Sequence, residues 1–250
     1  METCTVNTIE WEVFHKVSLG EKNVRRCPIL IALLFASIAT QPTSVSLLAA
    51  DKPKGPERWE STIAKFEAED KANPPAEGGI MFLGSSSIRM WDVEKWFPGL
   101  PVVNRGFGGS QIADSLYYAE RIVVPRKPRV IVFYAGDNDI AGGKTPERVF
   151  ADYQAFVAKI HKYLPETKIA FIAIKPSISR WRLVEPMREA NQMIAELSSK
   201  DERLEYIDVD APMIGDDGKP RKELFRKDGL HMTDAGYKIW TDLVMPHVKP

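Results

Sequence analysis

The stretch Arg129–Asp139, RVIVFYAGDND, carries the clearest indication of how this chain folds. Its first part, Arg129–Tyr134, consists mostly of β-branched and aromatic residues, which predicts a strand buried on both faces. The residues Gly136–Asp139 follow after one alanine, and their composition is typical of a turn. The stretch therefore predicts a parallel strand whose carboxyl end opens into a polar loop.

The same unit recurs along the chain, with helical patterns between the apolar runs. We predict strands over residues 80–83, 101–104, 129–134, 168–174 and 204–209. We predict helices over residues 57–72, 112–121, 145–163, 183–199 and 234–243. Strands that alternate with helices imply a parallel sheet covered on both faces. The expected fold is therefore a single α/β domain, a three-layer α/β/α sandwich with a five-stranded parallel sheet.

The composition is that of an ordinary globular protein without a dominant charge. The chain has 250 residues, of which 44% are hydrophobic and 27% are charged. Lysine and arginine number 34, and aspartate and glutamate also number 34, so the formal net charge is zero. Nucleic acid as a main partner would require a basic excess, so we expect no nucleic-acid binding.

The first fifty residues have the layout of a secretory leader. Two arginines precede the apolar run Pro28–Ala39, PILIALLFASIA, and small residues follow as far as Ala50. A membrane-spanning helix requires about twenty apolar residues, and this run is shorter. We therefore expect residues 1–50 to be an N-terminal extension and signal peptide, cleaved near Ala50, and residues 51–250 to be the functional domain. The product would be secreted or periplasmic with no stable membrane span; a retained anchor is the alternative.

Functional sites in open parallel sheets form at the carboxyl ends of the strands, so the residues after each predicted strand matter most. The first strand is followed by Gly84–Ser87, GSSS, in which a hydroxyl can project over a helix start. The second is followed by Asn104–Ser110, whose three glycines leave backbone N–H groups free to bind an anion. A dinucleotide-binding turn does not fit, because Gln111 stands in the place of the third glycine. Each pattern alone is also that of a plain turn.

Two further polar groups follow the third and fifth predicted strands. Asn138 carries an amide that can donate to a developing anion. Asp228 and His231 are three residues apart, a spacing that can place a carboxylate against an imidazole. A serine hydroxyl becomes a good nucleophile only when an adjacent base accepts its proton. A serine, a glycine, an asparagine and an aspartate–histidine pair at one rim of one sheet together predict a catalytic site.

In these residues the chain resembles the SGNH hydrolases, also called GDSL-type esterases and lipases, from about Gly79 to the C-terminus. The family's blocks Gly-Asp-Ser, Gly, Gly-x-Asn-Asp and Asp-x-x-His correspond here to Gly84-Ser85-Ser86, Gly109, Gly136–Asp139 and Asp228–His231. More narrowly, the chain looks like members related to acetylhydrolases of platelet-activating factor and to lysophospholipase-like esterases. Ser85 stands where the family has aspartate, which alters the surroundings of the nucleophile position but not the nucleophile.

The resemblance implies a flavodoxin-like sandwich that hydrolyses carboxylic esters without a cofactor or a metal. It implies that Ser86 is the nucleophile, that His231 is its base and that Asp228 orients His231. The backbone N–H groups of Ser86 and Gly109 and the side-chain amide of Asn138 would form the oxyanion hole.

The substrate is expected to be a small-molecule, carbohydrate or lipid ester. Arg180 and Trp181 follow the fourth predicted strand, so they are our candidates for substrate binding. A small sandwich without an evident lid favours short acyl groups, such as acetyl groups on a sugar or a lipid.

Two other functions fit parts of the sequence. A metal-dependent phosphoesterase could use Asp137 and Asp139 together with Asp216 and Asp217, since hard cations prefer oxygen ligands. No matching histidine cluster accompanies these carboxylates, and both cysteines lie in the leader. The second alternative is a non-catalytic carbohydrate-binding module that keeps the fold without the chemistry.

Overall fold

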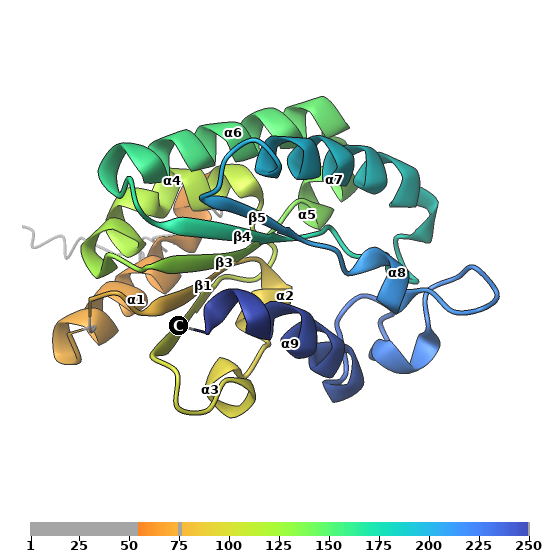
Figure 1. Cartoon of the computed structure of the whole chain (residues 1–250), viewed down its shortest axis with the longest axis horizontal. Coiled ribbons are helices and arrows are strands. Elements are labelled where there is room, and N and C mark those ends of the chain that lie inside the picture. Colours follow the sequence, from red (N-terminus) through yellow and green to blue (C-terminus); the bar gives the residue numbers. More distant parts are fainter. Residues whose placement is uncertain (1–54, 75–76, 250) are drawn as a thin grey trace, which may run out of the picture. The chain divides into compact units, whose positions relative to one another are not determined.

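A five-stranded parallel sheet forms the centre of the protein (Figure 1). The computed structural model describes residues 55–74 and 77–249, so the predicted signal peptide and its cleavage position lie outside the described residues. The strands stand in the order β2-β1-β3-β4-β5. Their bounds are β1 (Ile80–Gly84), β2 (Val102–Gly106), β3 (Val130–Tyr134), β4 (Lys168–Ile172) and β5 (Leu204–Ile207).

Helices cover both faces of this sheet, as Figure 1 shows. One face carries α1 (Glu60–Ala72), α4 (Ile112–Ile122), α6 (Pro146–Tyr163) and α7 (Val184–Ser198); the other carries α3 (Val93–Trp96) and α9 (Asp234–Val248). Three short helices follow strands directly: α2 (Ser86–Arg89), α5 (Asp137–Ala141) and α8 (Asp210–Met213). The described residues also form the short 3-10 helices η1 (Pro56–Trp59), η2 (Val124–Arg126), η3 (Trp181–Leu183) and η4 (Lys222–Leu224). The predicted three-layer α/β/α sandwich is confirmed.

The apolar character of the strands follows from burial on both faces. On β1, Met81 and Leu83 join the cluster under α1, α4, α6 and α7, whereas Ile80 and Phe82 join the cluster under α3 and α9. Every residue of β1 and β3 is buried, because these strands lie inside the sheet and side chains alternate between its two covered faces.

The end of β2 was predicted too early. The predicted strand stopped at Asn104, but the structure continues it to Gly106, with Arg105 in register with Leu83 of β1. Arg105 is buried, and its guanidinium forms ion pairs with Glu69, at 3.2 Å, and with Asp70. From the sequence, a charged residue at the end of a strand is taken for part of a loop, because its carboxylate partners lie on a helix some 35 residues earlier.

Other element ends differ for local reasons. Strands β4 and β5 are shorter than predicted, and the last helix continues through Pro246 to Val248, because Val244 and Val248 remain buried in the core. The predicted turn at Gly136–Asp139 instead opens the short helix α5.

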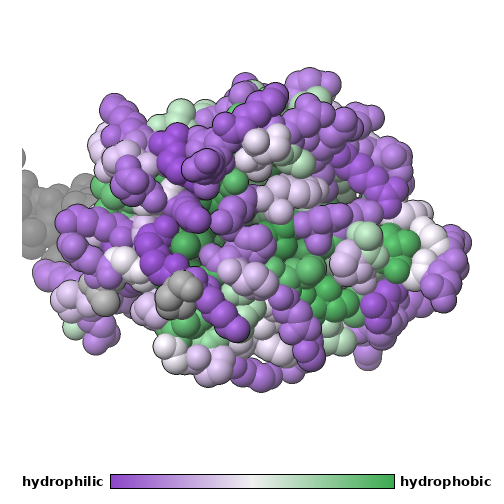
Figure 2. Space-filling view, viewed as in Figure 1, coloured by the Kyte–Doolittle hydropathy of each residue, from purple (hydrophilic) through white to green (hydrophobic). Residues whose placement is uncertain are grey.

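The outer surfaces of the covering helices are mainly hydrophilic in the view of Figure 2, and apolar side chains show chiefly near α8 and α9. Within residues 55–74 and 77–249, the structure contains no helix with the length and apolar character needed to cross a bilayer.

Candidate active site

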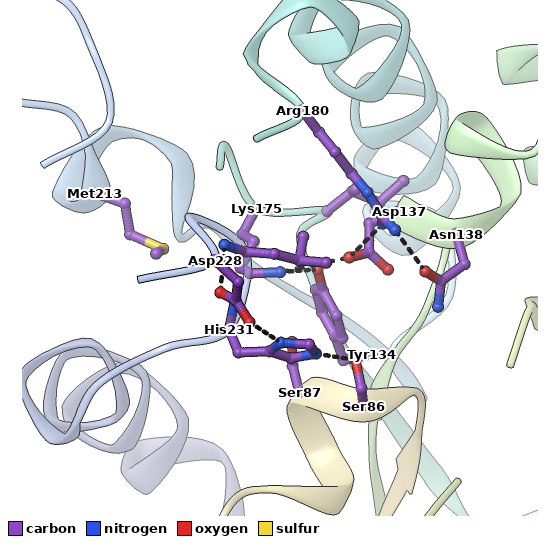
Figure 3. A network of polar contacts seen from close by, with 12 residues as sticks. Ser86, Ser87, Tyr134, Asp137, Asn138, Lys175, Arg180, Met213, Asp228 and His231 are labelled. Atoms are coloured by element: carbon purple, nitrogen blue, oxygen red, sulfur yellow. Dashed lines mark hydrogen bonds and ion pairs between the residues drawn. The ribbon is translucent and has the colours of Figure 1, made fainter. Parts of the chain in front are cut away.

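Strand β1 ends in a backbone conformation that places Ser86 at the start of α2. Gly84 has φ +140°, and a Cβ there would lie 1.9 Å from the carbonyl oxygen of Tyr134, so only glycine fits. The N–H of Ser85 donates to that same carbonyl at 3.0 Å, which holds the chain at the sheet's edge as it turns into the helix. Ser86 is half-buried at this turn, with its hydroxyl directed toward the ring of His231 (Figure 3).

Ser86, His231 and Asp228 form one chain of hydrogen bonds (Figure 3). His231 Nδ1 lies 2.6 Å from Asp228 Oδ2, the geometry of an N–H donating to a carboxylate. That assignment leaves Nε2 as the acceptor for the Ser86 hydroxyl, whose oxygen lies 3.0 Å away. The hydroxyl and the imidazole come from segments 145 residues apart, so tertiary packing brings them together.

Asp228 is held as a carboxylate. The hydrogen bond from His231 lowers the pKa of Asp228 well below its usual value, and the backbone N–H of Leu230, which donates to Oδ1 at 2.9 Å, lowers it further. The backbone N–H of His231 donates to the same oxygen at 3.0 Å. An ionised carboxylate in this position fixes the imidazole tautomer and can stabilise the protonated ring.

A surface cavity of about 440 Å³ opens over the serine and the histidine. The residues that line it come from five separate parts of the chain: Trp59, Thr62, Ser86, Arg89, Gly108, Gly109, Asn138, Leu230 and His231. Gly109 has φ +80°, a conformation that favours glycine. Three groups predicted as oxyanion donors, on Ser86, Gly109 and Asn138, therefore face one cavity.

The side chain of Asn138 is held at both of its polar atoms. Its Nδ2 donates to the carbonyl oxygen of Ser110 at 3.0 Å, and its Oδ1 accepts from Nη2 of Arg180 at 2.9 Å (Figure 3). Because the oxygen is bound to a guanidinium and one N–H to Ser110, the orientation of the amide is defined. Nδ2 has no second acceptor among the described residues, and Asn138 lines the cavity.

A buried group of charges lies behind Asn138. Asp137 Oδ2 is 3.0 Å from Nη1 of Arg180 and 3.4 Å from Nζ of Lys175, which also donates to the Tyr134 hydroxyl at 3.0 Å. The Arg180 contact is an ion pair whose N–H is poorly aligned for a hydrogen bond. Burial lowers the pKa of Lys175, and the charge of Asp137 opposes this effect. One carboxylate here faces two cationic side chains.

Asp139 supports the same region from inside the protein. It is fully buried and accepts from the backbone N–H of Ile112, at 3.3 Å, and from Nζ of Lys144, at 2.8 Å. Burial raises the pKa of Asp139, and the ammonium of Lys144 opposes the shift. Asp139 therefore links α5 to the start of α4. This contact helps to position the glycine turn that contains Gly109 and precedes α4.

The two residues predicted to bind substrate lie elsewhere. Arg180 sits behind Asn138, and neither Arg180 nor Trp181 is among the described residues that line the cavity at Ser86. Trp181 lines a separate hollow of about 570 Å³ together with Ile178, Gly215 and Asp217. Their role in substrate binding stays a prediction that the geometry does not favour.

Much of the cavity wall is formed by residues that no sequence pattern points to. Trp59 and Thr62 come from the N-terminal end of the domain, and no sequence pattern linked them to the serine. Arg89 could have been found, because it stands three residues after Ser86 on a predicted helix start and such residues share a helix face.

The carboxylates proposed for a metal-dependent phosphoesterase do not gather. No group of three or more histidine, cysteine, aspartate or glutamate side chains is placed for metal binding within the described residues. Asp137 and Asp139 instead each bind the cationic side chains described above.

Comparisons with known proteins agree with this architecture. A family model described as the GDSL-like lipase/acylhydrolase family matches residues 89–239. No curated protein sequence matches the chain.

Several solved structures share the fold. A Streptococcus pneumonia protein provisionally assigned as a platelet activating factor has 22% identity and a TM-score of 0.69, covering 76% of this chain and 92% of its own. A GDSL-like lipase from Bacteroides thetaiotaomicron has 19% identity and a TM-score of 0.61, covering 75% of this chain and 97% of its own. A carbohydrate esterase of family 3 from Talaromyces cellulolyticus has 16% identity and a TM-score of 0.53, covering 68% and 95%.

The family match spans more than half of the chain and includes the residues Gly109, Asn138, Asp228 and His231. The parallel sheet and its flanking helices are those of the structural neighbours. The chain therefore belongs to the GDSL-like lipase/acylhydrolase family and is a hydrolase of ester bonds.

Proposed function

We propose that this protein is an exported serine esterase that cleaves carboxylic esters with a triad of Ser86, His231 and Asp228. The observation that carries the proposal is the unbroken hydrogen-bond chain from the serine hydroxyl to the carboxylate, with distances of 3.0 and 2.6 Å. Export is supported by the leader-like residues 1–50 alone. N-terminal sequencing of the secreted protein tests that part.

The reaction begins when Ser86 Oγ attacks the ester carbonyl and His231 Nε2 accepts the hydroxyl proton. The tetrahedral intermediate collapses, the ester C–O bond breaks, and His231 returns its proton to the departing alcohol. Water then attacks the acyl-serine ester, giving its proton to His231. Cleavage of this second intermediate releases the acid and restores the serine, and Asp228 stabilises the charged imidazole in both halves.

The negative charge on the carbonyl oxygen requires donors that are already in place. The backbone N–H groups of Ser86 and Gly109 and the amide of Asn138 would supply them, since all three residues line the cavity. The bonds from Asn138 to Ser110 and Arg180 would hold its amide before substrate arrives. A donor fixed in advance costs no reorganisation during the reaction.

The substrate we propose is an ester with a short acyl group, such as acetyl, on a carbohydrate or a lipid. A cavity of about 440 Å³ that is open to solvent suits a small acyl group better than a long chain. Trp59 in its wall offers aromatic surface against which a sugar ring or a flat apolar group can pack. The similarity to a carbohydrate esterase supports the same choice.

Covalent labelling tests the nucleophile without a choice of substrate. A fluorophosphonate probe should label the wild-type protein at Ser86 and should not label Ser86→Ala, and the two proteins should have nearly equal melting temperatures. If the wild-type protein is neither labelled nor active on a broad panel of esters, a carbohydrate-binding module becomes the better interpretation.

A series of para-nitrophenyl esters from acetate to palmitate tests the acyl preference. We expect kcat/KM to be highest for acetate or butyrate; a maximum at long acyl chains would contradict the proposed substrate.

A further inference from the structure

Arg89 is a cation that the proposed mechanism does not use, although it lines the cavity over Ser86. It is the last residue of α2, the short helix that begins with Ser86. Residues three apart on a helix project from the same side, so the guanidinium and the hydroxyl face the same space. The Arg89 side chain is exposed to solvent and therefore accessible to a ligand.

The guanidinium lies against the glycine turn. A Cβ built on Gly108 would come within 2.7 Å of Nε of Arg89 and within 3.2 Å of its Nη2. Because Gly108 has no side chain, it leaves room for the guanidinium of Arg89. Its neighbour Gly109 is a proposed oxyanion donor. The positive charge thus lies beside the place where the ester carbonyl would bind.

No described residue neutralises this charge. Arg89 forms no ion pair and no side-chain hydrogen bond within residues 55–74 and 77–249, whereas Arg58, at the same end of the domain, is paired with Asp114 at 3.2 Å. No carboxylate stands among the described residues that line the cavity, and Asp228 is bound to His231. Behind Asn138, two cationic side chains face a single carboxylate.

From this arrangement we propose that Arg89 selects esters that carry an anionic group, such as a carboxylate, a sulfate or a phosphate, close to the scissile bond. A guanidinium binds such a group through paired, charge-assisted hydrogen bonds. The inference rests on the proposed esterase function and adds the substrate class. The anion can belong to the acyl part or to the alcohol part of the ester, since Arg89 lines the cavity that would hold both.

Two matched pairs of substrates separate these cases. On the acyl side, the para-nitrophenyl monoester of succinate is compared with para-nitrophenyl butyrate, and on the alcohol side, 4-acetoxybenzoate is compared with 4-acetoxybenzamide. We expect wild-type kcat/KM to favour the anionic member of at least one pair by about tenfold, and we expect added salt to reduce the ratio. Equal values, or a preference for the neutral member in both pairs, would overturn the proposal.

Variants of Arg89 test whether this residue causes the preference. Arg89→Gln should bring the ratio close to one, and Arg89→Lys should keep part of it because the positive charge remains. The matched control is Arg182→Gln, an exposed arginine outside the cavity, which should leave the ratio unchanged. If Arg89→Gln is folded and keeps the full wild-type ratio, the assignment to Arg89 is wrong.

Failure of this inference can be told apart from failure of the esterase proposal. A protein that hydrolyses neutral esters and accepts a fluorophosphonate at Ser86, but shows no anion preference, refutes only the inference about Arg89. A protein that does neither refutes the esterase proposal itself.

Discussion

Arg180 binds the side-chain oxygen of Asn138 at 2.9 Å, and its other terminal nitrogen lies 3.0 Å from Asp137 (Figure 3). The arginine lies behind the amide, so it contributes by positioning. Because the guanidinium accepts no hydrogen bonds, it can bind only the oxygen of Asn138, and this leaves the amide nitrogen directed toward Ser110 and the cavity.

We expect Arg180→Ala to lower kcat by about tenfold to a hundredfold, less than the 10²–10³ that follows loss of an oxyanion donor in a studied protease. KM should change little, since the amide acts mainly on the oxyanion. Arg180→Lys should restore part of kcat, because an ammonium can reach one of the two partners. Steady-state kinetics on para-nitrophenyl acetate measure kcat and KM separately for each variant.

The control for this prediction is Arg182→Ala, two residues along the chain with an exposed side chain. If Arg180→Ala and Arg182→Ala have the same kcat, or if Arg180→Ala only lowers the melting temperature, the positioning role of Arg180 is contradicted.

Asp228→Asn tests the contribution of the carboxylate to the proposed chemistry. Asparagine cannot stabilise a protonated His231 and can favour the wrong tautomer, so kcat should fall by about 10³–10⁴, as the equivalent change does in a serine protease. The substrate KM should remain similar, because Asp228 does not line the cavity. Single-turnover measurements with para-nitrophenyl acetate would show the loss in the acylation step; unchanged acylation would exclude Asp228 from the triad.

The stability of the protein at acid pH should provide an independent test of Asp228. The folded protein lowers the pKa of Asp228, so folding favours its charged form. The resulting stabilisation is complete above the ordinary aspartate pKa of about 3.9 and is lost as the pH falls through the lowered value. Because the side chain is 49% exposed, solvent screening keeps the effect small.

We therefore expect wild type to melt slightly above Asp228→Asn from neutral pH down to about pH 5. The gap should narrow below about pH 4, where the unfolded wild-type chain becomes protonated. Thermal unfolding of both proteins across this pH range measures the difference in melting temperature. A gap that is constant to the acid limit of the fold would contradict the assignment.

Gly84→Ala should disrupt the turn that presents Ser86. An alanine there must adopt φ +140° and place its Cβ 1.9 Å from a backbone oxygen that cannot move freely. We expect a loss of at least ~3 kcal/mol in the free energy of unfolding, or failure to fold. Gly143→Ala is the matched control: it also has a positive φ, +90°, but its Cβ would meet no atom within 4 Å.

Gly143→Ala should therefore show only the backbone strain, about 1 kcal/mol. Chemical denaturation of both variants gives the comparison, and equal losses would mean that contact with Tyr134 does not constrain the turn.

The strands and the polar residues that follow them could be predicted because neighbouring residues in the sequence determine them. A strand between two covered faces must be apolar at nearly every position, and RVIVFY satisfies that requirement by itself. The pair of Asp228 and His231 was visible for the same reason, since three residues of chain can bring their side chains together in one loop.

The residues whose surroundings could not be predicted are those whose partners lie far away along the chain. Arg105 was assigned to a loop because its carboxylate partners lie about 35 residues away on α1. Arg180 was predicted to meet substrate, yet it binds an amide 42 residues earlier. Trp59 and Thr62 reach the cavity because the N-terminal turn and α1 pack beside α4.

The chain's local pattern thus set the sheet, its order of polar loops and the chemical groups at its rim. The distances between these groups, the wall of the cavity and the lack of an ion-pair partner for Arg89 among the described residues arise from tertiary packing. The physical reason is that hydrophobic periodicity depends on near neighbours along the chain, whereas a contact across 145 residues depends on how every intervening element is packed.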